Sequence, residues 1–356
     1  MITPLTAISA APSIARDRDQ SIDALRGLAI GLILLVHLNL WGIGIIPRAW
    51  ESGIDQGLAT ALVWFGHGKL YGVFAFLFGM SAAWLQKRGG GLWARRMVIL
   101  AIIGYGHQLI WSGDILFVYG CLGLALPLVW HWSGGRLAGL AAGLLAVPVM
   151  LWGLLAWGAA AGSVAVIIGS SGGLSVIQIL IWWPQVAAMI LLGLAVGRAG
   201  ILGSLNRRLA WGLAVGIPLA GLDAFMQLAA PPLSLAGRGV GVIGGAGLAL
   251  GYVGLFMLAW PFVGERIRPY LAALGRMALT HYLCHTLIML FLFDVVGLSV
   301  RPVESVGLWG LVVVGQAVVG RAWLEKRGGG PVELVWRRLA VVTGGLSAAK
   351  LLSPYR

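Results

Sequence analysis

The sequence predicts an all-α protein that crosses a membrane several times, and three observations carry this prediction. Apolar residues make up 59% of the 356 residues, whereas charged residues make up only 10%. The mean hydropathy is +0.92, which is typical of a chain that lies mostly within a bilayer. Stretches of about twenty apolar residues alternate with short polar breaks, as expected for helices that span the hydrocarbon core.

Ten of these stretches are predicted to be membrane-spanning helices. They cover residues 22–46, 66–86, 93–112, 114–132, 137–160, 176–198, 207–229, 239–263, 269–292 and 305–324. Lys and Arg concentrate in alternate connections, for example at Lys87, Arg208 and Lys326. By the positive-inside rule, these connections and both termini face the cytoplasm. The chain is therefore expected to be a multi-pass membrane protein.

Three regions follow from this topology. Residues 1–20 are too polar for a cleaved signal peptide and are expected to form a cytoplasmic leader. Residues 21–326 form the helical bundle, and residues 327–356 contain a cationic segment expected to lie as an interfacial helix on the inner leaflet. The net charge of +13 is scattered over segment ends and forms no basic stripe, which excludes nucleic acid as a partner.

Ionisable residues within the apolar segments are the strongest indication of function, because they are costly there. Arg26 and His37 are eleven residues apart on the first span, so they share one helix face about 16 Å apart. His37, His107 and His285 fall at similar depth in the outer half, with His281 nearer the middle. Three helices are thus expected to present imidazole groups to one cavity.

Acyl transfer accounts for most of these residues. An imidazole at His37 can remove a proton from an acceptor hydroxyl or amine as that group attacks a thioester. His107 and Asp114 are expected to form a second catalytic pair, a base with its orienting carboxylate. The alternative for Asp114 is a capping residue at the start of the next helix.

The simplest donor is a cytoplasmic acyl-CoA, most simply acetyl-CoA. Its phosphates need cations at the inner surface, and Arg26, Arg95, Arg96 and Arg276 are predicted near that level. The alternative for Arg26 is an ion pair with Asp23 on the same helix face. We expect a polar passage to join this cationic mouth to the chamber lined by imidazole groups.

The acceptor would bind on the outer side. Its candidate contacts are His67, Lys69, His281, His285 and Asp223, although the Lys69 ammonium group can instead extend to the outer headgroups. A glycan, a lipid-linked sugar or a small secreted metabolite would each fit these groups. The predicted partners are thus the lipid bilayer, acyl-CoA, this acceptor and a second copy of the chain in a homo-oligomer.

Two other functions are compatible with the same residues. Titratable histidines and the buried Arg276 could serve a proton-coupled transporter of an anionic small molecule, although the chain shows no paired halves with broken helices. His281 and His285 have the i,i+4 spacing of a metal or haem site, but no carboxylate stands at matching spacing. Cys121 and Cys284 lie within predicted spans, so no metal is predicted.

Several motifs resemble the YeiB-like family of bacterial inner-membrane proteins. They are Gly68–Tyr71 with Phe76–Gly79, His107 followed by Trp111–Leu116, Gly275–Thr280, and Gly330–Glu333 with Trp336–Arg337. The stretch Ser21–Gly27 resembles the opening of the transmembrane acyltransferase superfamily, and the spacing of Arg26 and His37 resembles a motif of the acyltransferase-3 family, whose histidine is regarded as catalytic. The resemblance implies a membrane acyltransferase. The chain departs from the YeiB-like pattern at positions 37, 281 and 285, where histidine replaces the expected asparagine, asparagine and glutamine.

Overall fold

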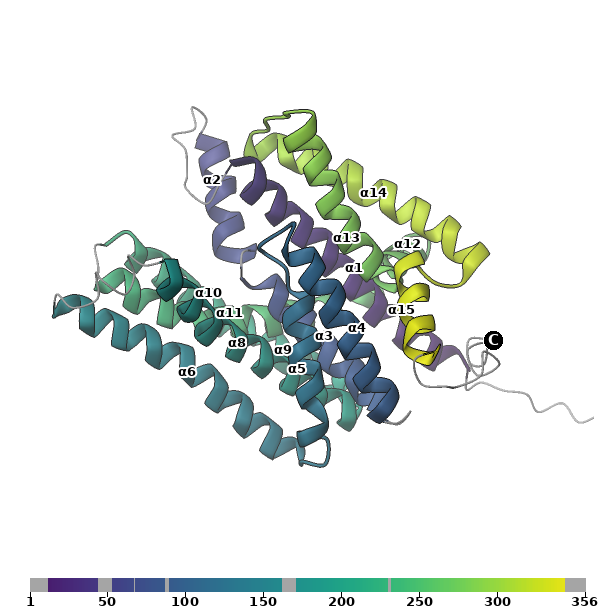
Figure 1. Cartoon of the computed structure of the whole chain (residues 1–356), viewed down its shortest axis with the longest axis horizontal. Coiled ribbons are helices and arrows are strands. Elements are labelled where there is room, and N and C mark those ends of the chain that lie inside the picture. Colours follow the sequence, from purple (N-terminus) through teal and green to yellow (C-terminus); the bar gives the residue numbers. More distant parts are fainter. Residues whose placement is uncertain are drawn as a thin grey trace, which may run out of the picture.

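The computed structural model describes residues 12–43, 53–66, 68–86, 90–161, 171–229 and 232–342, with the side chains of 12–19, 40–43 and 171–178 left out. Within these residues every regular element is a helix, which confirms the predicted fold class. In chain order the helices are α1 (Pro12–Ile43), α2 (Gly53–Ala61), η1 (Leu62–Gly66), α3 (Leu70–Leu85), α4 (Gly90–Gln108), α5 (Leu116–Ala125), η3 (Leu126–Val129), α6 (Gly134–Ala160), α8 (Ser171–Ala199), α9 (Leu202–Ala210), α10 (Gly212–Gln227), α11 (Leu233–Ala259), η4 (Trp260–Phe262), α12 (Arg268–Arg276), α13 (Ala278–Met289), η5 (Leu290–Val295), α14 (Pro302–Arg327) and α15 (Pro331–Val342) (Figure 1).

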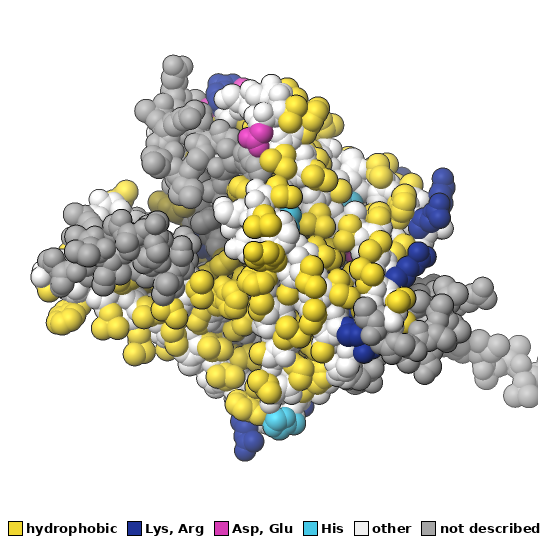
Figure 2. Space-filling model, viewed as in Figure 1, with side chains coloured by type: hydrophobic (Ala, Val, Ile, Leu, Met, Phe, Trp, Pro, Cys, Tyr) yellow, Lys and Arg dark blue, Asp and Glu magenta, His cyan; other side chains and the backbone are white. Residues whose placement is uncertain are grey.

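Eight helical segments in the described part of the chain are long and apolar enough to cross a membrane. The sequence predicted ten. The difference lies in α4 and α5, which do not reach this standard: the apolar segment Leu116–Val129 is shorter than a full span. The stretch expected as one span at 269–292 is also divided, because α12 ends at Arg276 and α13 begins at Ala278. Large apolar side chains cover much of the face seen in Figure 2, and many large apolar residues of the described chain are exposed, so the protein is a multi-pass membrane protein.

Helix α1 lies near the centre of the arrangement, between α3 and the group formed by α12, α13 and α14 (Figure 1). Its contact with α12 depends on two glycines. A Cβ atom added at Gly27 or Gly275 would meet backbone atoms of the other helix, including the Asp23 carbonyl oxygen. Glycine is needed at this crossing because it lets two backbones approach closely in a bilayer. Helices α3 and α8 also approach closely at glycines, because a Cβ atom added at Gly79 or Gly193 would meet backbone atoms of the other helix.

Basic residues from separate connections gather at one end of the bundle, which we call the basic end. Contacts there join residues far apart in the sequence: Arg198 donates a hydrogen bond to the Trp132 carbonyl, and Arg276 donates one to the Gly328 carbonyl. Arg207 and Arg208 lie in the last turn of the neighbouring helix α9. This arrangement agrees with the orientation that the positive-inside rule predicts, in which the basic end faces the cytoplasm.

The C-terminal helix α15 packs against the bundle at the basic end. Trp336 donates a hydrogen bond to the Arg96 carbonyl, and Arg95 donates one to the Ala340 carbonyl. Ala340 is fully buried. The sequence predicted an interfacial helix in this part of the chain, and these contacts anchor α15 to α4.

Glu333 of α15 binds the start of α13. Its Oε1 atom accepts hydrogen bonds from the backbone N–H groups of Leu279 and Thr280, and its Oε2 atom accepts one from the Thr280 hydroxyl at 2.5 Å. The first N–H groups of a helix have no partner within the helix. A buried carboxylate from elsewhere in the chain therefore supplies the N-terminal cap of α13.

Replacing Glu333 with alanine is expected to destabilise the protein by roughly 2–4 kcal/mol, because it leaves buried donors without a charged acceptor. Thermal unfolding of the purified protein in detergent would show a lower Tm. Glu325→Ala is the matched control, since this side chain on α14 is 65% exposed. Equal melting temperatures for the two variants would contradict the capping role.

Candidate functional site

His107, at the end of α4, is held by hydrogen bonds at both ring nitrogens. Nδ1 lies 2.7 Å from Oδ1 of Asp114, and Nε2 lies 2.8 Å from Oγ1 of Thr286 on α13. All three side chains are buried. A carboxylate only accepts hydrogen bonds, so Nδ1 of the neutral ring carries the proton and Nε2 accepts from the Thr286 hydroxyl. This is the geometry of a base that a carboxylate orients.

Asp114 fulfils both roles that the sequence left open. While Oδ1 binds His107, Oδ2 accepts a hydrogen bond of 2.8 Å from the backbone N–H of Phe117 in the first turn of α5. The turn before Asp114 is tight, because a Cβ atom at Gly113 would lie 2.7 Å from Nε1 of Trp111. The residues 111–114 therefore form one compact unit that holds both an aromatic ring and a carboxylate.

His37 on α1 contacts this unit from the other side. Its ring centroid lies 5.4 Å from that of Trp111 and 6.5 Å from that of Tyr282 on α13. Tyr282 in turn lies 5.2 Å from the ring of His107. The Tyr282 ring thus connects the two imidazoles, which the sequence had placed at similar depth. His37 is half-buried, whereas His107 is buried.

The Tyr282 side chain is buried, and its hydroxyl lacks a well-formed hydrogen bond. The side chain is 3% exposed, and its hydroxyl forms no hydrogen bond of acceptable geometry with any described group, although it lies near the Ile115 backbone. An unpaired buried hydroxyl costs about 1–3 kcal/mol.

His281 and His285 lie at the contact between α13 and α14, away from His107. They face α14, where Nε2 of His285 lies 2.9 Å from Oε1 of Gln316 and His281 lies beside Gly320. Nε2 of His281 and Nδ1 of His285 have no hydrogen-bond partner among the described groups. The prediction that His285 shares a cavity with His37 and His107 is therefore wrong: α13 directs Tyr282 and Thr286 toward His107 and turns its histidines toward α14.

Arg26 pairs with Asp23 at 2.6 Å, and its other terminal nitrogen donates a hydrogen bond to Ser81 on α3. The ion pair between Arg26 and Asp23, which the sequence suggested as the alternative role of Arg26, is thus present. Between Arg26 and His37 the same face of α1 carries Ile30 and Ile33, which are 1% and 8% exposed. These side chains are packed, so the expected polar passage along this face is wrong.

An apolar groove of about 330 Å³ lies beside the next face of α1. From α1 it is lined by Leu25, Leu32 and Val36, which spans the levels of Arg26 and His37. Phe65 and Tyr252 line its other side, and the Tyr252 hydroxyl donates a hydrogen bond to the Phe65 carbonyl. The groove therefore offers an apolar route between the two levels that the sequence expected a polar passage to join.

The other arginines predicted to bind the donor lie at the basic end. Arg95 binds the Ala340 carbonyl, and Arg96 stacks over Trp336 at 5.7 Å, so both support α15. Arg276 was expected inside a continuous span. It is instead exposed at the break between α12 and α13, which removes the need for a buried partner.

Of the predicted acceptor contacts, Lys69 and Asp223 attract each other electrostatically. Lys69 donates a hydrogen bond to the Val63 carbonyl, and Asp223 accepts one from Gln227. His67 lies outside the described residues. Within the described residues no three His, Cys, Asp or Glu side chains gather as metal ligands, and the absence of a metal stays a prediction.

Sequence reasoning missed Thr286 and Tyr282. Their spacing of four residues places them on one face of α13, but His281 and His285 have the same spacing one step around the helix. The sequence therefore favoured His281 and His285 as site residues, whereas Tyr282 and Thr286 are the residues of α13 that contact His107. The capping carboxylate of Glu333 was also missed, although the motif Gly330–Glu333 had been noted.

Comparison with known proteins places the chain among relatives of similar length. The family model described as "Protein of unknown function (DUF418)" matches residues 196–343. The chain is 28% identical to the uncharacterized protein YeiB of Escherichia coli K12, over 94% of this chain and 99% of that protein. It is 26% identical to the uncharacterized protein YxaH of Bacillus subtilis 168, over 92% and 95% of the two chains. No solved structure gives a significant match. These matches confirm the resemblance carried by the motifs: the chain is similar to YeiB and YxaH over nearly its whole length, and its residues 196–343 match the DUF418 family model.

Proposed function

We propose that the protein is a bacterial inner-membrane acyltransferase that moves an acyl group from cytoplasmic acyl-CoA to an acceptor at the outer side. The observation that carries this proposal is the cluster around Tyr282. There, His107 is oriented by Asp114 at 2.7 Å, and the Tyr282 ring contacts both His107 and the half-buried His37. A second imidazole with a fixed tautomer beside an accessible one supports acid–base chemistry.

In this proposal His37 is the general base. It takes the proton from the acceptor hydroxyl or amine as that oxygen or nitrogen forms a bond to the thioester carbon. The carbon–sulfur bond then breaks, and the CoA thiolate leaves with the proton returned from the His37 imidazolium. The unpaired hydroxyl of Tyr282 is a suitable donor to the oxyanion that forms between these steps. His107 and Asp114 position the Tyr282 ring.

The apolar groove supports a path for the donor. It extends along α1 from Leu25 to Val36, a rise of about 16 Å. We place the CoA phosphates at the basic end near Arg26, with the thioester arm in the groove and the acyl carbon at the end of the groove near Val36, the residue before His37. The acceptor, a glycan, a lipid-linked sugar or a small secreted molecule, would approach from the outer side.

Donor binding can be tested by thermal-shift measurements with acetyl-CoA, longer acyl-CoAs and CoA. We expect a clear rise in Tm for the wild type, and loss of that rise in Leu32→Trp, which fills the groove. Leu311→Trp is the matched control, because Leu311 is 74% exposed on α14 and outside the groove. No stabilisation by any CoA compound would contradict the proposal. Stabilisation by small anions alone, without thioester turnover, would favour the transporter.

Arg26 needs its own pair of variants, because its guanidinium already binds Asp23. Arg26→Gln removes the cation, while Asp23→Asn removes the ion pair and keeps the cation. We expect CoA stabilisation to be lost in the first and retained in the second. Equal loss in both variants would show that the ion pair matters only for structure.

A further inference from the structure

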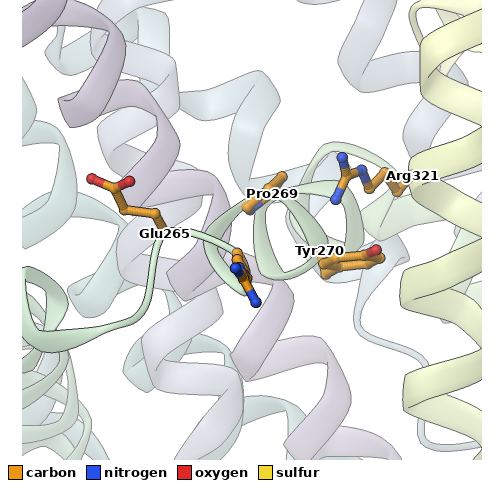
Figure 3. A pocket seen from close by; sticks show the side chains of 5 residues that line it. Glu265, Pro269, Tyr270 and Arg321 are labelled. Atoms are coloured by element: carbon orange, nitrogen blue, oxygen red, sulfur yellow. The ribbon is translucent and has the colours of Figure 1, made fainter.

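A second candidate binding site lies at the basic end, between α12 and α14. It is a pocket of about 380 Å³ lined by Glu265, Arg266, Pro269, Tyr270 and Arg321 (Figure 3). The volume is near the lower limit of small-molecule sites and suits a compact group. Neither the proposed catalytic cluster nor the apolar groove shares a residue with this pocket.

The pocket presents cationic donors with spare capacity. The Arg321 guanidinium lies over the Tyr270 ring at 4.6 Å, and its Nε atom contacts Glu325 at 3.2 Å. The terminal nitrogens of Arg321 have no other partner among the described residues. Arg266 is exposed and also makes no hydrogen bond or ion pair with them. Glu265 points away from Arg321 and Tyr270 (Figure 3). Two guanidinium groups at one opening suit a phosphate, which they can bind with paired hydrogen bonds.

The surface next to the pocket indicates where that phosphate comes from. Leu311, Val314 and Val318 precede Arg321 at spacings that place all four residues on one face of α14. The three apolar side chains are 74%, 63% and 51% exposed. Ten residues separate Leu311 from Arg321, which corresponds to about 15 Å along a helix and to about half of a hydrocarbon core. An exposed apolar stripe of this length matches the acyl chain of one leaflet.

The loop before α12, on the other side of the pocket, also combines exposed apolar side chains with cationic residues. Phe262 is 89% exposed and Ile267 is 56% exposed, next to the cationic residues. Arg268 lies over the Trp260 ring at 5.2 Å, the kind of pair found where a helix leaves the membrane. We infer that this pocket binds the phosphate headgroup of an anionic phospholipid of the cytoplasmic leaflet, whose acyl chain lies along Val318, Val314 and Leu311.

Native mass spectrometry of the detergent-solubilised protein, titrated with phosphatidylglycerol, tests this inference. Each arginine near a membrane surface contributes about fivefold to binding of an anionic lipid. The double variant Arg266→Gln/Arg321→Gln is therefore expected to bind phosphatidylglycerol roughly 25-fold more weakly. Arg207→Gln/Arg208→Gln, which removes the same charge at the same end but outside the pocket, should bind like the wild type. Phosphatidylcholine should bind weakly to all three proteins.

Two results would overturn the assignment. If both double variants lose binding equally, the attraction comes from the overall charge of the basic end and not from this pocket. If inorganic phosphate alone raises the Tm of the wild type as much as phosphatidylglycerol does, and the pocket variant abolishes both effects, the site takes a soluble anion. All four replaced arginines lie at the surface of the basic end, so the variants should fold.

Discussion

Replacing His37 with alanine is expected to lower acyl transfer by at least 100-fold, the lower limit for removal of a general base. The bundle should stay folded, because His37 is half-buried and its ring centroid lies 5.4 Å from that of Trp111 and 6.5 Å from that of Tyr282, so a smaller side chain leaves the surrounding helices in place. The measurement is the rate of CoA release from acyl-CoA by protein in liposomes, with acceptor present. Stabilisation by acyl-CoA should persist in the variant, since the groove lining does not include His37.

The matched control is His131→Ala. It removes an imidazole from an exposed position at the opposite end of the bundle and should leave the rate unchanged. A His37→Ala protein as active as the wild type would show that His37 is not the base. In that case Tyr282→Phe would still report on the cluster, because loss of an oxyanion donor lowers the rate by about 100-fold or more.

The largest effect on stability is expected from Gly275→Leu. A Cβ atom at this position would collide with the Asp23 carbonyl of α1, and backbone atoms in two packed helices cannot move aside as a flexible side chain can. Overpacking commonly costs 1–3 kcal/mol and occasionally more, and the upper part of this range or beyond is expected here. Because α1 holds His37 and α12 leads directly into α13, the variant should also lose the cluster around Tyr282.

Size-exclusion chromatography after a temperature series would measure this loss. Gly310→Leu provides the control, since a Cβ atom at Gly310 on α14 would meet no atom within 4 Å. Both variants add the same apolar volume, so they differ only in what surrounds the glycine. A Gly275→Leu protein that melts at the wild-type temperature would mean that the crossing of α1 and α12 is looser than described.

The helical fold and part of the site could be predicted from the sequence because they depend on local spacing. Arg26 and His37 share a face of α1 by helical periodicity, and His107 meets Asp114 because a turn of six residues brings them together. The rest depends on how helices rotate about their axes. Nothing in the sequence near α13 determines that Tyr282, and not His281, faces His107.

The expected polar passage failed for a related reason. Periodicity showed that Arg26 and His37 lie on one face, but it did not show what packs against that face. Ile30 and Ile33 lie between them and are buried, so the open space lies one face further around the helix. The sequence predicted two more spans than the eight found among the described residues, because α4 and α5 carry enough apolar residues to suggest crossings, whereas the apolar segment Leu116–Val129 is shorter than a full span.

The capping of α13 by Glu333 has a consequence for biosynthesis. A chain emerges from the ribosome with its N-terminal end first, so the start of α13 is translated more than fifty residues before Glu333. Until then the first N–H groups of α13 lack the carboxylate that binds them in the finished protein. The helix carrying Tyr282 and Thr286 thus receives its N-terminal cap only after α14 has been synthesised.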